Sequence, residues 1–120
     1  MRRDRRRSRS EFMAEPNQMT AVELKALIDA QAKFCLLDVR EAWEVALASI
    51  PGSLHIPLNE LPSRWRELDA ASSVIVMCKS GGRSQRAAQF LVAQGLGRVS
   101  NLEGGILGWA RDIDPGTPEY

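Results

Sequence analysis

The sequence lacks any apolar run close to the ~20 residues that cross a bilayer, and its 120 residues include two cysteines and one histidine. A membrane-spanning helix is thereby excluded, and two cysteines are too few for a disulfide-rich secreted scaffold. The two could still form one bridge. However, Cys35 stands near the start of one predicted strand and Cys78 at the end of another, which is too far apart if the strands are parallel. A reduced, cytoplasmic protein is therefore expected.

The net charge of +1 hides an uneven distribution. Residues 1–10 contain six Arg and one Asp, giving +5, whereas the remaining ten Lys and Arg face fourteen Asp and Glu, giving −4. Outside the basic arm there is no footprint for nucleic acid, so neither nucleic acid nor membrane is an expected partner. The arm itself should be disordered. Residues 1–12 are interpreted as a leader, either vector-derived or from an upstream start, and Met13 as the native initiator of a single domain over residues 13–120.

Short strands alternate with short helices along this domain. Apolar runs predict strands at 34–39, 54–56, 74–77 and 99–102. Helices are expected at 20–30, 41–47, 58–68 with an interruption near Pro62, 84–94 and 106–111. The alternation predicts an α/β fold with a single small parallel sheet and helices on both faces. Trp43, Trp65 and Trp109 are expected to pack in the core, and the Pro- and Gly-rich end should form an extended surface tail without regular structure.

The segment from Val74 to Gln94 carries the strongest functional signal. The run Val-Ile-Val-Met predicts a central strand buried on both faces, and Cys78 follows at its carboxyl end. A polar loop, Cys-Lys-Ser-Gly-Gly-Arg, then leads to a helix that we expect Ser84 to cap and Gly95 to end. The loop therefore lies between the end of a strand and the start of a helix, where unpaired N–H groups attract anions.

This placement should activate the cysteine. Gly81 and Gly82 are expected to adopt backbone conformations closed to other residues and to turn the loop N–H groups of residues 79–83 inward. Lys79 and Arg83 add positive charge close to the sulfur. A thiol in this setting has a depressed pKa and becomes a thiolate nucleophile at neutral pH.

Three further residues are candidates for supporting roles. Asp38 lies at the end of the strand at 34–39 and Arg40 directly after it, and the carboxyl ends of parallel strands gather at one edge of the sheet with Cys78. We favour a structural ion pair or cap for Asp38, while Arg40 could add to the local positive field. The single histidine, His55, could act as a general base, but a lone histidine in a short strand is more often structural.

The loop Cys78-Lys-Ser-Gly-Gly-Arg-Ser resembles the active-site loop of the rhodanese family of sulfurtransferases. The similarity extends to Leu-Leu-Asp-Val-Arg-Glu-Ala-Trp-Glu at 36–44, Ile-Pro-Gly-Ser-Leu-His-Ile-Pro-Leu at 50–58 and Asn-Leu-Glu-Gly-Gly-Ile-Leu-Gly-Trp at 101–109. Together these segments span about Thr20 to Trp109. The final segment, residues 109–120, also resembles the tail of rhodanese domains fused to adenylylating enzymes.

The resemblance implies a rhodanese-type thiosulfate sulfurtransferase without a metal or organic cofactor. Cys78 would accept sulfur from thiosulfate or a persulfide, carry it as a covalent persulfide and pass it to a thiophilic acceptor. Lys79, Ser80, Gly81, Gly82 and Arg83 would form the loop that binds the anion. The expected partners are a small sulfur donor and a protein that accepts or carries sulfur.

Three alternatives remain open at this point. Cysteine phosphatases use a similar loop, but with five residues between Cys and Arg, whereas four separate Cys78 from Arg83 here. A non-catalytic rhodanese module that recognises a partner is expected where the cysteine is replaced, and Cys78 is present. An inert core cysteine would not require the two glycines and two cations that surround Cys78.

Overall fold

The computed structural model describes residues 15–69 and 72–120, so the predicted leader at 1–12 lies outside the described residues. Within them, five parallel strands form one sheet in the order β1-β5-β4-β2-β3. The strands are β1 (Asn17–Met19), β2 (Cys35–Asp38), β3 (Leu54–His55), β4 (Val74–Met77) and β5 (Val99–Leu102). The helices are α2 (Ala21–Asp29), α3 (Ala42–Leu47), α4 (Leu61–Arg64), α5 (Gly82–Ala93) and α6 (Gly105–Asp112).

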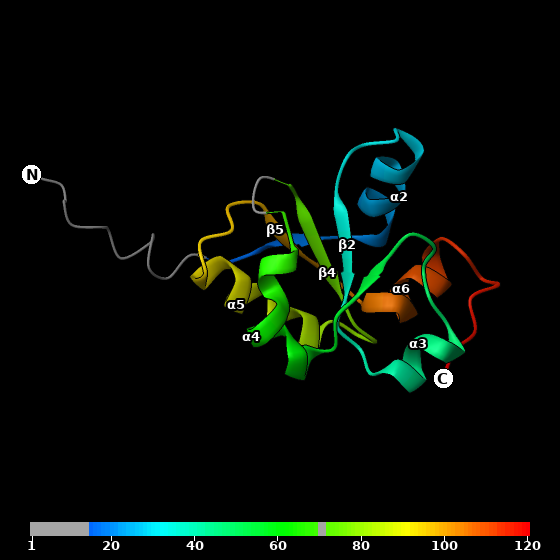
Figure 1. Ribbon diagram of the computed structural model, residues 1–120. Coiled ribbons are helices and arrows are strands. Elements are labelled where there is room, and N and C mark those ends of the chain that lie inside the picture. The colour runs from blue at the N-terminus through cyan, green and yellow to red at the C-terminus, as the bar shows by residue number, and fades with distance from the viewer. Residues whose placement is uncertain (1–14, 70–71) are drawn as a thin grey trace, which may run out of the picture.

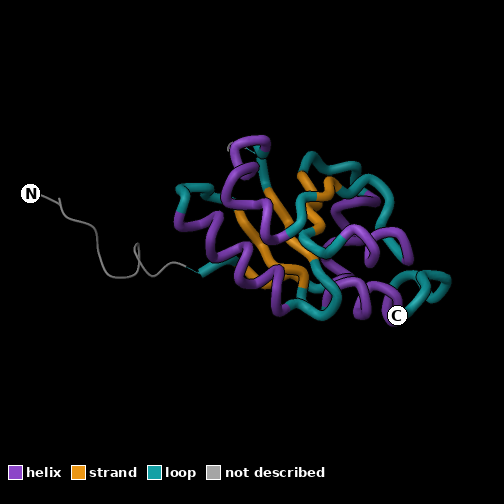
Figure 2. Tube along the Cα trace, turned by 60° about the horizontal axis from the view of Figure 1, so that its bottom comes forward, coloured by secondary structure: helices purple, strands orange, loops and turns teal. Residues whose placement is uncertain are grey.

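Helices cover both faces of the sheet, as the sequence predicts. α4 and α5 lie on one face and α2 and α6 on the other (Figure 1), and the strands run between these two layers (Figure 2). Along β4, Val74 and Val76 pack in the core beneath α5, while Ile75 and Met77 pack in the core beneath α2 and α6. β4 is the middle strand of the sheet, so residues that follow its carboxyl end are held by neighbours on both sides.

The helix expected from residue 20 and the absence of a bridge between the two cysteines are both confirmed. The Thr20 hydroxyl accepts from the Glu23 N–H at 3.1 Å, and the Glu23 carboxylate accepts from the Thr20 N–H at 2.8 Å, which completes a capping box. Cys35 is in register with Val74, four residues before Cys78, and both cysteines are free thiols.

Two parts of the chain differ from the sequence prediction. The edge strand β1 was not predicted, because its residues Asn-Gln-Met show no strand pattern and it is defined by pairing with β5. Residues 58–68 form two 3₁₀ turns around the short helix α4 instead of one helix. Pro62 lies in the first turn of α4, where its missing N–H costs no hydrogen bond.

The prediction that Trp43 points into the core is wrong. Trp43 on α3 is 62% exposed, whereas its neighbour Glu44 is 3% exposed. α3 turns Glu44 inward because the carboxylate forms an ion pair with Arg83, as described below. The other two tryptophans follow the prediction: Trp109 is buried and Trp65 packs against the core.

Candidate active site

Cys78 occupies the carboxyl end of the middle strand and points into a set of hydrogen-bond donors. Its sulfur accepts from the Gly81 N–H at 3.1 Å, the Ser84 N–H at 3.3 Å and the Ser84 hydroxyl at 3.2 Å. The residue is buried, with 1% of its surface exposed. The sulfur therefore sits where the unpaired N–H groups of the first turn of α5 converge.

Gly81 makes this loop possible. It is the N-cap of α5 and adopts φ +113°, a conformation that residues with a side chain rarely take. Two sequence predictions about this turn are wrong. Ser84 is not the cap but lies inside the first turn with its hydroxyl near the sulfur, and Gly82 has an ordinary helical conformation, so it is Gly81 alone of the pair whose backbone requires glycine.

The first turn of α6 holds the cysteine loop through its backbone. The Ile106 N–H donates to the Cys78 carbonyl at 3.0 Å and the Leu107 N–H donates to the Lys79 carbonyl at 3.1 Å. Gly105, directly before Ile106, adopts φ +55°, and a Cβ atom there would lie 2.5 Å from the Cys78 carbonyl oxygen. Gly105 therefore allows the two backbones to approach, so that N–H groups of α6 bind the Cys78 and Lys79 carbonyls.

A buried polar chain leads away from Cys78. The Ser84 oxygen lies 2.6 Å from the Asn101 side-chain oxygen, and the Asn101 amide donates to Gln18 at 3.0 Å. Since the Ser84 hydroxyl has one proton, it can donate to Asn101 or to the Cys78 sulfur, but not to both at once. Asn101 thus competes with the Cys78 sulfur for this hydrogen bond. A negative charge on the sulfur favours the rotamer in which the Ser84 hydroxyl donates to the sulfur.

The donors decide the ionisation of Cys78. Burial by itself raises the pKa of this thiol, but hydrogen bonds from the Ser84 hydroxyl and from the N–H groups of Ser84, Gly81 and Ser80 outweigh burial and hold the pKa below its ordinary value. Cys35 shows the contrast, because burial raises its pKa without such compensation. Of the two thiols, Cys78 is the one prepared to act as a nucleophile.

Charged side chains surround the loop in pairs. Arg83 donates to both carboxylate oxygens of Glu44, at 2.6 and 2.8 Å. Chiefly through these hydrogen bonds, the pKa of Glu44 falls from 4.5 to about 2. Asp38 and Arg40 form a second ion pair at 2.7 Å with both side chains fully buried. That geometry agrees with the structural role favoured for Asp38. The Asp38 carboxylate also neutralises much of the Arg40 charge, so that Arg40 adds little to the positive field at the loop.

Residues 20–112 match the Rhodanese-like domain family. The chain belongs to the rhodanese-like family. A sulfurtransferase of Allochromatium vinosum is 37% identical over 95 residues, which cover 79% of this chain and 89% of that protein. Maize adenylyltransferase and sulfurtransferase MOCS3-1 is 36% identical over 115 residues, covering 90% of this chain but 25% of that protein. The crystal structure of a thiosulfate sulfurtransferase from Pseudomonas aeruginosa superposes with a TM-score of 0.74 at 36% identity and covers 80% of this chain and 19% of that chain.

These matches confirm the family and the fold that the sequence resemblance implies. The sulfurtransferase names of the relatives support a transferase of the rhodanese family. This chain covers most of the bacterial sulfurtransferase but only about a quarter of the maize protein, whose name joins two activities.

The structure also places the single histidine, His55. His55 bonds through its ring Nε2 to the Arg40 carbonyl at 2.7 Å, which agrees with a structural role. Within residues 15–69 and 72–120, no group of three or more His, Cys, Asp or Glu side chains could hold a metal ion. In the same part of the chain, none of the helices combines the length and apolar character needed to cross a membrane.

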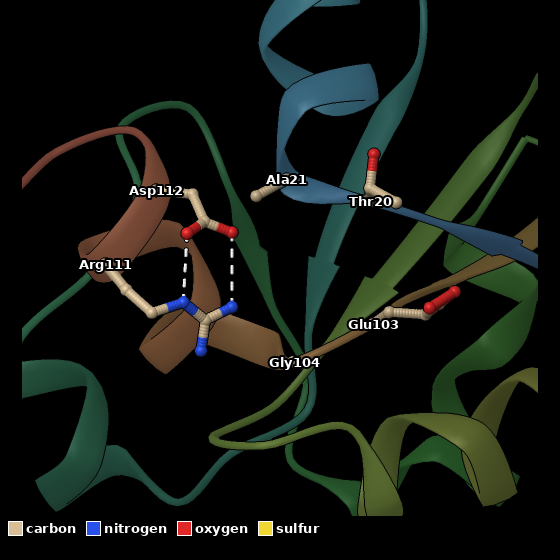
Figure 3. Close-up of a pocket in the computed structure, with 6 residues that line it drawn as sticks. All are labelled: Thr20, Ala21, Glu103, Gly104, Arg111 and Asp112. Carbon is tan, nitrogen blue, oxygen red and sulfur yellow. Dashed lines mark hydrogen bonds and ion pairs between the residues drawn. The ribbon is translucent and has the colours of Figure 1, made fainter.

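A surface pocket of about 240 Å³ lies beside the turn between β5 and α6 (Figure 3). It is lined by Thr20, Ala21, Glu103, Gly104, Arg111 and Asp112. Arg111 and Asp112 point toward each other and pair at 2.9 Å, so the cation of this pocket is balanced within it. None of its lining residues belongs to the cysteine loop.

Sequence reasoning missed four residues of the site: Glu44, Asn101, Gly105 and Tyr120. Glu44 and Asn101 fall within segments that resemble the family. Their polar side chains in those segments were the signal that could have indicated a role at the site. Gly105 gave no signal, because its approach to the cysteine loop depends on how α6 packs. Tyr120 gave no signal, because its contacts depend on where the tail returns.

Proposed function

We propose that this chain is a sulfurtransferase that moves sulfane sulfur from thiosulfate or a persulfide donor to a thiophilic acceptor through a Cys78 persulfide. The observation that carries the proposal is the buried Cys78 sulfur with three hydrogen-bond donors at 3.1–3.3 Å and a lowered pKa. Such a sulfur forms the nucleophilic thiolate at a lower pH than an ordinary cysteine, yet it is shielded from bulk water.

In the first half of the cycle, the Cys78 thiolate attacks the outer sulfur of thiosulfate. A new S–S bond forms to Cys78, the bond between the two thiosulfate sulfurs breaks, and sulfite leaves with the electron pair. The negative charge then rests on the outer sulfur of the persulfide, and the N–H groups of the loop, including those of Gly81 and Ser84, are available to stabilise it. Removal of one such donor typically raises the reaction barrier by about 3 kcal/mol.

In the second half, a nucleophile attacks the outer sulfur of the persulfide. The Cys–S to outer-sulfur bond breaks and the electron pair returns to Cys78, which restores the thiolate. With cyanide as acceptor, the product is thiocyanate. A thiolate of an acceptor protein would leave as a new persulfide, and a sulfur-carrier protein is the acceptor class we propose. No metal or organic cofactor takes part in these steps.

Lys79 and Arg83 are proposed to attract the anionic donor. Arg83 is 31% exposed on its side chain even while it is paired with Glu44, so a donor can reach its edge. The loop length argues against the phosphatase alternative. Four residues separate Cys78 from Arg83, whereas the loop of a cysteine phosphatase has five between its Cys and Arg.

A thiolate that must cycle through reduced and persulfide forms favours a reducing compartment, and we therefore propose a cytoplasmic location.

The test uses the full chain with thiosulfate and cyanide. Wild-type protein should release thiocyanate and sulfite in equal amounts, Cys78→Ser should release neither, and Cys35→Ser should be close to wild type. Equal loss from the Cys35 change would show that the wrong nucleophile has been chosen. Hydrolysis of p-nitrophenyl phosphate without thiocyanate formation would favour the phosphatase, and inactivity in both assays would leave the binding-module alternative.

A further inference from the structure

The tail of the chain returns to the charged side of the active site. Residues 113–120 contain no helix or strand, as the sequence predicts, but Tyr120 is half-buried and does not lie free on the surface. Its ring meets Trp43 edge-on, with ring centroids 6.0 Å apart and planes at 80°. Figure 1 shows the C end of the chain beside α3. Tyr120 therefore forms part of the surroundings of the cysteine loop.

The hydroxyl of Tyr120 links two charged pairs. Arg40 donates to this hydroxyl at 2.9 Å, and the hydroxyl donates to the Glu44 carboxylate at 2.8 Å. Arg40 is itself fixed by Asp38 and by the Ala48 carbonyl at 2.7 Å. Burial, the largest effect, raises the pKa of Tyr120, so the hydroxyl stays protonated at neutral pH and keeps this donor role. The hydroxyl therefore anchors the ring in one position.

The anchored ring lies beneath a cation of the loop. The Lys79 ammonium is 4.7 Å from the centre of the Tyr120 ring, within the range of a cation–π interaction. Lys79 directly follows Cys78 in the sequence, and its long side chain would otherwise sample many positions. The same ring also lies 5.6 Å from the Arg40 guanidinium.

We infer that Tyr120 is a positioning residue that holds the Lys79 ammonium at the edge of the cysteine loop and so gives the site a preference for anionic sulfur compounds. This inference rests on the proposed function and extends it to a residue outside the family match, which ends at residue 112. Because Lys79 and Arg83 are both held by neighbours, the positive field at the sulfur does not depend on chance side-chain positions.

The charge preference can be measured without sulfur transfer. Iodoacetate and iodoacetamide alkylate a thiolate with the same leaving group but differ in charge. The ratio of their rates at Cys78, in the full chain carrying Cys35→Ser, reports the positive field at the sulfur. Tyr120→Leu should lower this ratio by about threefold or more, since the ring no longer holds Lys79. Tyr120→Phe keeps the ring but loses the anchor, so its ratio should fall between those of Tyr120→Leu and wild type.

Lys79→Gln supplies the matched control. If Tyr120 acts through Lys79, Tyr120→Leu should not lower the ratio further in a Lys79→Gln background. An effect of the same size in both backgrounds would overturn the assignment. So would an unchanged ratio in Tyr120→Leu, whether or not both absolute rates fall together, because a merely structural role changes both rates alike. Thermal unfolding of each variant checks that the fold is retained.

With thiosulfate and cyanide, Tyr120→Leu should raise KM for thiosulfate while kcat changes little. This second measurement separates the inference from the proposed function. A lowered alkylation ratio in a protein that forms no thiocyanate would keep the role of Tyr120 and remove the proposed reaction. Normal thiocyanate formation with an unchanged ratio and KM in Tyr120→Leu would keep the reaction and remove the role of Tyr120.

Discussion

Replacing Ser84 by alanine tests how the site ionises Cys78. The change removes one of three hydrogen bonds to the sulfur, the hydroxyl contact at 3.2 Å, and leaves the N–H donors of Gly81 and Ser84 in place. A hydrogen bond to a charged group is worth about 1.5–3 kcal/mol. Because Asn101 competes for the same proton, we take the lower end, and 1.4 kcal/mol is about a factor of ten in an equilibrium constant.

Ser84→Ala should therefore raise the pKa of Cys78 and reduce its thiolate population about tenfold at a fixed pH below that pKa. The measurement is the rate of alkylation by iodoacetamide as a function of pH, in a Cys35→Ser background. Iodoacetamide is neutral, so its rate follows the thiolate fraction and not the attraction of an anion by Lys79 and Arg83.

Ser80→Ala is the matched control. Its backbone N–H contributes to the lowered pKa of Cys78, and alanine preserves that group while removing an exposed hydroxyl. The control should have a pH profile close to wild type. If Ser84→Ala also kept the wild-type profile, the Ser84 hydroxyl would not stabilise the thiolate, and the backbone alone would account for the ionisation.

Two further predictions concern the support of the site. Gly105→Ala should destabilise the fold by about 2–3 kcal/mol or more, because its Cβ would overlap the Cys78 carbonyl. Gly97→Ala is the control, since a Cβ there meets nothing within 4 Å and its stability in urea unfolding should stay close to wild type. Similar losses of stability in the two variants would refute the close approach at Gly105. Glu44→Gln should cost about 3 kcal/mol of unfolding free energy at pH 7, from a pKa lowered from 4.5 to about 2 by Arg83. Since the pKa of Glu44 is lower in the folded state, this stabilisation is present above pH ~4.5 and is lost as the pH falls toward 2. The cost of Glu44→Gln should therefore be smaller at pH 3 than at pH 7. An equal cost at both pH values would contradict the stabilising ion pair.

Much of the fold could be predicted because its signals are local. The helix that follows Thr20 and the apolar run of β4 each depend on neighbouring residues, and both are confirmed. The strand β1 is different, since Asn17–Met19 pair with β5 across more than 80 residues of sequence and show no pattern of their own. Edge strands of this kind are defined by their partners.

In the candidate site, too, the residues with local sequence signals could be predicted and those brought in from distant segments could not. Cys78 and its loop could be located from the sequence, because a strand end, a glycine and a helix start are consecutive there. The partners of the loop come from distant segments: Glu44 from α3, Asn101 from β5 and Tyr120 from the tail. Trp43 shows why local pattern was insufficient. A large aromatic residue next to a glutamate favours burial of the aromatic, but the charge of Arg83 reverses the choice.

The most direct test of the account is whether the Cys78 sulfur gains a second sulfur atom. Cys35→Ser protein incubated with thiosulfate, freed of excess donor and examined by intact-protein and peptide mass spectrometry should carry the mass of one added sulfur on the peptide that contains Cys78. Cyanide should remove that mass and release thiocyanate in equal amount. An unchanged mass after incubation, or added sulfur that cyanide cannot remove, would contradict the proposed persulfide cycle.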